Sequence, residues 1–443
     1  MSADAAGRAE TSRSGFVTSI AILGGLFFII GFFTWLNGPL ITFVRLAFEQ
    51  TDVGSFLILM VFYLSYLVLA LPASWILRRT GLKKGLSLAL TIMAVGAATF
   101  GEFATRRWYP GALTGLFIIG GGLAVLQTAI NPYISMLGSI DGAARRIALM
   151  GICNKSAGIA APLLIGSLVL KGIGDLSSQV EAAGPIERAR LLDAFAAKIH
   201  TPYLLMAGVL LVVAAAVLAS PLPEIKAAAA NARFSDAQRG VTADGRGIFG
   251  FPHLWLGVAC LFVYVGVEVI AGDAIGVYGR GFGLPLDQTK FFTAFTLSAM
   301  LLGYVSGLLA IPRVTSQEGY LRASALLGVV LVAGAFLTKG YVSVGFVAAL
   351  GFANAMMWPA IFPMAIRGLG RATETGSALL VMGIAGGAVI PETFGLLKQH
   401  YDFQAVFAAL TSPCYLYIFW YAWRGHRVGQ GGPEPATALE GAA

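Results

Sequence analysis

Charged residues are scarce in this chain of 443 residues. Only 12% of them are Asp, Glu, Lys or Arg, whereas 57% are hydrophobic. An average soluble domain carries about 25% charged residues, so the composition excludes a soluble multidomain protein and indicates an integral membrane protein. The net charge of +8 does not indicate nucleic-acid binding, because the basic residues are spread over short polar segments.

Residues that bind metals or form disulfides are also few. The three cysteines, Cys153, Cys260 and Cys414, all fall in apolar segments, so they predict neither a disulfide framework nor a metal site. The four histidines are isolated, and no set of nucleophile and base accompanies them. A glycine-rich phosphate loop is absent, which argues against ATP-driven pumping. We therefore expect no enzyme, no cofactor and no metal.

Long apolar runs fill most of the chain. A helix that crosses a bilayer needs about 20 predominantly apolar residues, and twelve runs of this length are present. The predicted spans are 16–46, 53–77, 85–104, 110–138, 146–170, 201–222, 251–280, 287–312, 320–338, 341–367, 375–397 and 403–423. The sequence therefore predicts an all-α membrane protein with twelve transmembrane helices.

A polar connection divides these spans into two sets of six. The predicted parts are an N-terminal tail at 1–15, a six-helix bundle at 16–222, a central loop at 223–249, a second six-helix bundle at 250–425 and a C-terminal tail at 426–443.

Lys and Arg are more frequent in the segments on the side of the N-terminus. This bias predicts a multi-pass protein of the inner (plasma) membrane with both termini and the central loop in the cytoplasm. On the opposite side, the stretch from Ile186 to Ile199 has the pattern of an amphipathic helix lying at the membrane interface.

The two halves repeat one pattern of glycine and proline. The motif Gly-x3-Pro-x3-Gly occurs at 158–166 in the fifth predicted span and again at 387–395 in the eleventh. Two parallel six-helix repeats, related by an axis along the membrane normal, are the plan of the major facilitator transporters.

Three charged side chains, Lys155, Glu268 and Asp273, lie inside predicted spans. Ionisable groups in the membrane interior are costly, and they usually face a cavity, pair with one another or mark a solute path. Lys155 is far from both ends of its span, which predicts a carboxylate partner. Glu268 and Asp273 are separated by about 140° around a regular helix, so either could be that partner. The alternative is a bridge that only holds the halves together.

Seven further residues are candidates for binding a solute. They are Thr34, Asn37, Gln127, Asn131, Asn154, Asn354 and Trp358. Amides present donors and acceptors together, as sugar hydroxyls require, and an indole face suits the C–H face of a pyranose. The structural alternatives are a packing tryptophan and hydrogen bonds between helices, worth roughly 0.6–2 kcal/mol each.

Five short segments resemble the fucose:galactose:proton symporter family of the major facilitator superfamily, in particular its bacterial glucose/galactose transporter branch. The segments are Trp-Leu-Asn-Gly-Pro-Leu at 35–40, Gln-Thr-Ala-Ile-Asn-Pro at 127–132, Gly-Ile-Cys-Asn-Lys at 151–155, Tyr-Val-Gly-Val-Glu at 264–268 and Trp-Pro-Ala-Ile-Phe at 358–362. The resemblance covers nearly all of the twelve-helix body. It implies a central sugar site between the halves, alternating access and import driven by a cation gradient.

Two positions depart from the fucose-type pattern. That type has Asp where this chain has Gly38, and Glu where it has Gln127. Coupling through these two positions is therefore excluded. Either coupling has moved to Glu268 or Asp273, poised against Lys155, or the protein is a uniporter whose acids are structural. We favour coupling, to a proton rather than to sodium.

The sequence thus predicts a carrier of a hexose, with glucose and galactose as the favoured substrates and a monomer as the working unit. Two other classes remain as alternatives. One is a sugar receptor that does not transport, and the other is an exporter of amphipathic compounds, which would have an apolar, aromatic-rich cavity rather than one lined by amides.

Overall fold

Apolar runs of membrane length form helices throughout the computed structural model, which describes residues 13–136, 143–222, 248–311, 313–369 and 373–429. Within these ranges, twelve helices are long and apolar enough to cross a membrane. The prediction of an all-α fold with twelve spans is confirmed. Most residues of the two predicted tails and of the predicted central loop (1–12, 223–247 and 430–443) lie outside the described residues.

The described residues of the N-terminal half form nine helices, which include its six spans. They are α1 (Arg13–Trp35), α2 (Asn37–Ala47), α3 (Asp52–Thr80), α4 (Leu82–Thr105), α5 (Tyr109–Met136), α6 (Ala143–Leu168), α7 (Ile173–Ala182), α8 (Pro185–Ala197) and α9 (His200–Ala219).

The C-terminal half contains more and shorter elements, because several of its spans are interrupted. They are η2 (Ile248–Gly250), α11 (Pro252–Gly272), α12 (Ile275–Arg280), α13 (Leu286–Thr289), α14 (Phe292–Ala310), α15 (Gln317–Leu337), α16 (Gly340–Asn354), α17 (Met357–Ala365), α18 (Thr373–Met382), η4 (Gly383–Ala385), α19 (Gly386–Leu397), α20 (Phe403–Trp423) and η5 (Gly425–Arg427).

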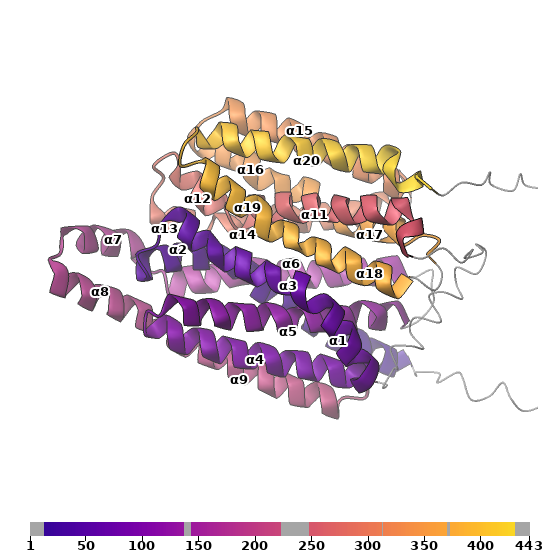
Figure 1. The fold of residues 1–443 in the computed structure, drawn as a ribbon, viewed down its shortest axis with the longest axis horizontal. Coiled ribbons are helices and arrows are strands. Elements are labelled where there is room, and N and C mark those ends of the chain that lie inside the picture. Colours follow the sequence, from indigo (N-terminus) through magenta and orange to yellow (C-terminus); the bar gives the residue numbers. More distant parts are fainter. Residues whose placement is uncertain (1–12, 137–142, 223–247, 312, 370–372, 430–443) are drawn as a thin grey trace, which may run out of the picture.

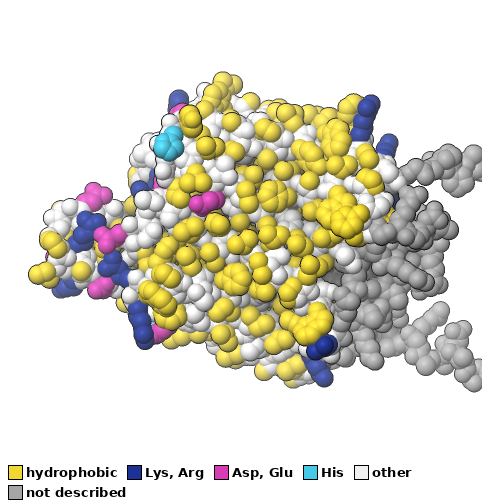
Figure 2. Space-filling model, viewed as in Figure 1, with side chains coloured by type: hydrophobic (Ala, Val, Ile, Leu, Met, Phe, Trp, Pro, Cys, Tyr) yellow, Lys and Arg dark blue, Asp and Glu magenta, His cyan; other side chains and the backbone are white. Residues whose placement is uncertain are grey.

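The two halves lie side by side along the long axis of the molecule (Figure 1). The described chain begins in α1 and ends after α20 at the same face, which we call the termini face, and α7 and α8 lie at the opposite face. Figure 2 shows hydrophobic side chains over most of the body between these faces, with Lys and Arg gathered toward the two ends. This distribution is the one that a bilayer requires of a spanning protein.

The residues predicted to form an interfacial helix do form a helix. This helix is α8, which makes a hairpin with α7 beyond the ends of the spanning helices (Figure 1). Ile186 is 90% exposed there. The apolar side of α8 instead packs on the protein, where the Phe195 and Phe43 ring centroids are 5.2 Å apart. The apolar side of α8 therefore packs against α2 and α4, and its position at the membrane interface stays a prediction.

Both copies of the glycine–proline motif lie where the two halves meet. A Cβ atom added at any of its four glycines would come within 3.2 Å of a side chain in the other half. The nearest partners across this interface are Leu297 for Gly158, Phe291 for Gly166, Tyr63 for Gly387 and Phe56 for Gly395. Each copy of the motif therefore allows two helices of opposite halves to approach closely. These pairs are α6 with α14 and α19 with α3.

The first and seventh predicted spans are both interrupted in the interior of the protein. The first breaks at Leu36, between α1 and α2, because Pro39 has no N–H to bond the preceding turn. Beside this break the Asn37 side-chain amide donates to the Thr34 carbonyl over 3.1 Å. The seventh breaks between α11 and α12, where Thr296 donates to the Ala271 carbonyl over 2.8 Å. Carbonyls freed inside a membrane need such partners.

Ion pairs tie the two halves together at the face opposite the termini face. Asp52, at the start of α3, accepts from Arg280 of the C-terminal half over 3.1 Å and also pairs with Lys398. Arg45, which like Asp52 belongs to the N-terminal half, lies 3.0 Å from the same carboxylate. We call these four residues the Asp52 cluster. They hold α2 and α3 against α12 and the end of α19, so the halves are closed on this side.

Candidate functional site

A cavity of about 150 Å³ lies between the two halves. Its walls come from α1, α3, α5 and α6 on one side and from α11, α14, α17 and η4 on the other. Sites for drug-sized ligands usually enclose ~300–1,000 Å³, so this space suits a small solute. The lining residues of α1 and α11 all precede the breaks in those spans. The cavity therefore lies on the side of the breaks nearer the termini face.

The lining combines aromatic faces with a few polar groups. The aromatic residues are Phe27, Trp35, Tyr63, Tyr66, Tyr264, Tyr304 and Trp358. The polar residues are Thr34, Gln127, Asn154, Lys155 and Glu268. This is a surface on which a small polar ring can stack while its substituents form hydrogen bonds.

An ion pair between the halves forms part of the wall. Lys155 Nζ on α6 lies 3.1 Å from Glu268 Oε1 on α11, with 7% and 11% of the two side chains exposed. The Lys155 ammonium also lies 4.4 Å from the centroid of the Trp35 ring. Lys155 thus has the carboxylate partner that its position predicted, and that partner is Glu268. A pair buried to this extent holds the halves together only while both charges remain.

Asp273 is separated from the cavity by the side chain of Tyr63. It lies in the break between α11 and α12 and is 1% exposed. The Tyr63 hydroxyl donates to Asp273 Oδ2 over 3.3 Å. The other oxygen faces the main chain of Gly38, where an added Cβ atom would be 3.2 Å from Oδ1. The two acids of the seventh span therefore have different surroundings.

Two of the predicted amides line the cavity. Gln127 donates from Nε2 to the Tyr66 hydroxyl over 2.9 Å, and Asn154 donates from Nδ2 to the Phe27 carbonyl over 3.4 Å. Both amides keep further hydrogen-bonding capacity for a solute. Of the remaining candidates, Thr34 and Trp358 also belong to the lining.

The other predicted amides lie elsewhere. Asn37 is buried and bonds the main chain of its own span, as described above. Asn354 is fully buried within the C-terminal half, where the Tyr415 hydroxyl of α20 donates to its Oδ1 over 2.9 Å. Neither residue lines the cavity. The side chain of Asn131 is outside the described structure.

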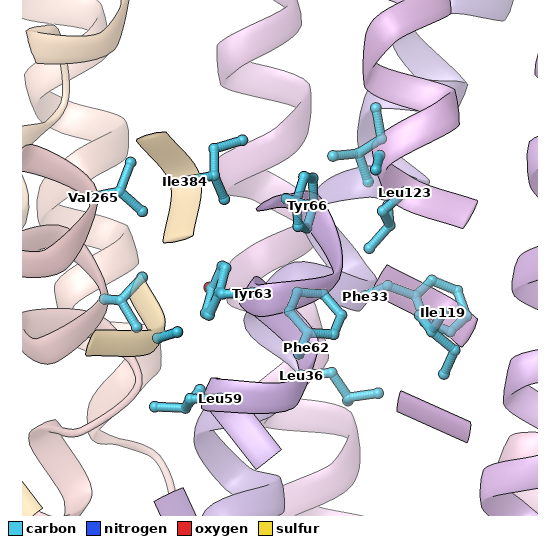
Figure 3. Close-up of a cluster of buried hydrophobic side chains, with 14 of the residues drawn as sticks. Phe33, Leu36, Leu59, Phe62, Tyr63, Tyr66, Ile119, Leu123, Val265 and Ile384 are labelled. Carbon is cyan, nitrogen blue, oxygen red and sulfur yellow. The ribbon is translucent and has the colours of Figure 1, made fainter. Parts of the chain in front are cut away.

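Sequence reasoning missed most of the aromatic lining. Tyr63 and Tyr66 are spaced i, i+3 on α3, so they share one face of the helix. Figure 3 shows Tyr63 directed toward Val265 and Ile384 of the other half, with Phe62 on the opposite side. The paired tyrosines were the available signal, but aromatic residues in apolar spans usually indicate packing alone.

The sequence model described as Major Facilitator Superfamily matches residues 23–391. The chain belongs to this superfamily. Its members are transporters, so the prediction that the chain is not an enzyme is confirmed. The major facilitator fold predicted from the two six-helix repeats is confirmed as well.

Individual relatives share most of their length with this major facilitator protein. The glucose/galactose transporter of Brucella abortus (strain 2308) is 29% identical over 422 residues, which cover 94% of this chain and 96% of the relative. The L-fucose-proton symporter of Escherichia coli (strain K12) is 27% identical over 421 residues, covering 94% of each chain. The predicted resemblance to these transporters is confirmed.

The fold also matches a solved structure. The crystal structure of the transporter FucP in the outward conformation superposes with a TM-score of 0.71 at 24% identity, and the match covers 93% of this chain and 99% of that one. At this identity the likeness establishes the fold.

Proposed function

We propose that the protein is a secondary transporter that imports a hexose, with glucose and galactose as the favoured substrates. The volume of the cavity, its aromatic faces and its two amides are suited to binding a small polar solute. The name of the Brucella abortus relative, a glucose/galactose transporter, supports the same class of substrate. Thr34, Gln127, Asn154 and Trp358 are the proposed sugar-binding residues.

The observation that carries the proposal is the Lys155–Glu268 ion pair, because it joins the two halves at the wall of the cavity. In alternating access the halves rock against one another around a central site. An ion pair across that site must change its surroundings whenever the halves move, so it can respond to a solute. A pair that only held the halves together would not need to lie beside the solute path.

We further propose that transport is coupled to a cation through the carboxylates of the seventh span. A proton is favoured, because the related Escherichia coli protein is named a proton symporter. Sodium is the alternative, since carboxylate and carbonyl oxygens also bind Na⁺. We place the protein in the inner membrane with both termini in the cytoplasm, from the bias of Lys and Arg toward that side.

A second candidate function has one observation in its favour. Seven aromatic residues line the cavity, which an exporter of amphipathic compounds would share. The amides favour the sugar, because an apolar solute would leave their remaining hydrogen-bonding groups without partners.

The experiment that tests the proposal is uptake of labelled glucose and galactose into proteoliposomes in sodium-free buffer. An imposed inward proton gradient should drive accumulation above equilibrium. Equilibration without accumulation would indicate a uniporter or a sodium-coupled carrier, and adding a sodium gradient separates these two. If neither sugar moves while a lipophilic dye is extruded, the sugar assignment is wrong and the exporter is favoured.

A further inference from the structure

The two acids of the seventh span differ in their counterions. Glu268 has the Lys155 ammonium at 3.1 Å, whereas no Lys or Arg in the described part of the chain lies within ion-pair distance of Asp273. The Tyr63 hydroxyl donates to Asp273 Oδ2, whereas Oδ1 faces the backbone of Gly38 and accepts no hydrogen bond of normal geometry among the described residues. At 1% exposure, Asp273 is also the more deeply buried of the two.

This difference decides which acid can change its charge more easily. A buried carboxylate without a cation is costly, and binding a proton removes that cost. Glu268 is already neutralised by Lys155, so a proton there would release a buried ammonium. The ionisable groups that face Asp273 are Tyr63 of α3, Glu268 of α11 and Lys155 of α6. The main chain of Gly38, which also lies beside Asp273, carries no net charge.

Tyr63 connects this acid to the cavity. Its side chain belongs to the cavity lining, and its hydroxyl donates to Asp273. Its ring stacks against that of Tyr66, with centroids 6.5 Å apart, and the Tyr66 hydroxyl in turn accepts from Gln127. A solute that contacts Tyr63 or takes hydrogen bonds from Gln127 therefore acts on the group that holds Asp273.

Asp273 also lies where the halves close. Gly38 belongs to the first turn of α2, and Asp273 precedes α12, so the carboxyl group is packed between the breaks of the first and seventh spans. Beyond these breaks, α2 and α12 lead to the Asp52 cluster. A neutral carboxyl group can remain buried between the two helix breaks. A charged one favours separation of α2 from α12 and access of water.

We propose that Asp273 is the carboxyl group that carries the coupled proton, and that Tyr63 is the positioning residue through which sugar in the cavity acts on it. This inference rests on the proposed function. In the proton step, the Asp273 carboxylate takes up one H⁺ from water on the side of the Asp52 cluster and becomes a neutral carboxylic acid. Loss of the same H⁺ toward the termini face restores the carboxylate.

The test uses the full chain in proteoliposomes, with labelled glucose and galactose and a pH-sensitive dye. Counterflow exchange, proton-driven accumulation and sugar-induced proton uptake are measured for wild type, Asp273→Asn and Tyr63→Phe. Asp273→Asn should keep exchange and lose both accumulation and proton uptake. Tyr63→Phe should lower accumulation by about tenfold and shift the pH dependence of exchange.

Tyr203→Phe is the matched control, because Tyr203 is a fully buried tyrosine of α9 whose hydroxyl has no partner in the described structure. It should behave as wild type. Proton-coupled accumulation by Asp273→Asn would overturn the assignment of Asp273. The role of Tyr63 would be overturned if Tyr63→Phe and Tyr203→Phe showed the same accumulation and the same pH dependence of exchange. Failure of the wild type to move either sugar would instead overturn the proposed function, and this inference with it.

Discussion

Lys155 on α6 and Glu268 on α11 form an ion pair at 3.1 Å that joins the two halves of the protein at its central cavity. The residues are 113 positions apart in the chain. Removing one member of a buried pair leaves the other charge without a counterion, which typically costs about 3–5 kcal/mol, whereas replacing both members by neutral groups costs far less.

We therefore predict that Lys155→Met lowers the thermal unfolding temperature of the purified protein clearly, and that adding Glu268→Gln restores most of the loss. The measurement is thermal unfolding in detergent, with the yield of folded protein as a second readout. Lys155→Met combined with Asp273→Asn is the matched control, because Asp273 is not within ion-pair distance of Lys155. Equal rescue by the two combinations would contradict the observed pairing.

The amides should separate into two groups by the effects of their alanine variants. Gln127 and Asn154 line the cavity, so each variant should raise the KM for sugar about three- to tenfold, as expected for one lost hydrogen bond. Asn354→Ala should leave KM near that of wild type. It should lower stability by about 1–3 kcal/mol, because the buried Tyr415 hydroxyl loses its partner. Initial uptake rates and thermal unfolding of the same preparations provide the check.

The Asp52 cluster should act as a gate on the face opposite the termini face. Asp52→Asn weakens the attraction to Arg280 and Lys398, which lie in the other half. We predict that the halves then separate more often on this side. A cysteine placed at Thr42, which is 5% exposed and close to Arg280, should become reactive at least about fivefold faster.

Labelling of intact cells with a membrane-impermeant thiol reagent measures this rate, in a background without the three native cysteines. Asp193→Asn is the control, because Asp193 pairs with Arg107 within the N-terminal half and on the same face. Faster labelling in both variants would point to general loosening of the structure rather than to a gate.

The glycine–proline motif should tolerate no added methyl group. In Gly158→Ala the new Cβ would lie about 3.0 Å from Leu297 Cδ1 and closer still to the Trp35 ring. Overpacking of this kind costs typically 1–3 kcal/mol, and here it also forces α6 away from α14. We predict lower stability and slower counterflow exchange.

Gly208→Ala in α9 is the comparison for that variant, since no atom of the described residues lies within 4 Å of its added methyl group. It should be neutral or slightly stabilising, because alanine is the better helix former. Wild-type exchange by Gly158→Ala would mean that the motif is not a close-packing device.

Short-range information was enough to predict the fold. The thickness of a bilayer fixes the length of an apolar span, so counting apolar runs identifies twelve helices without knowledge of their packing. The repeated Gly-x3-Pro-x3-Gly motif predicted two equivalent halves because close helix approach demands small residues in both. The stretch at Ile186 shows the limit of this reasoning, since an amphipathic face is equally suited to lipid and to a neighbouring helix.

The chemistry of the site depended on contacts that the sequence does not contain. Composition and spacing determined that three charges, several amides and a tryptophan lie within the membrane. Only the tertiary structure decided that Lys155 pairs with Glu268, that Asn354 bonds Tyr415 rather than facing the cavity, and that Tyr63 joins the cavity to Asp273. The physical reason is that the sequence does not fix how each helix is rotated about its axis or where it is interrupted. A side chain on a span can point in any direction around the axis, and only packing against the other half fixes that direction.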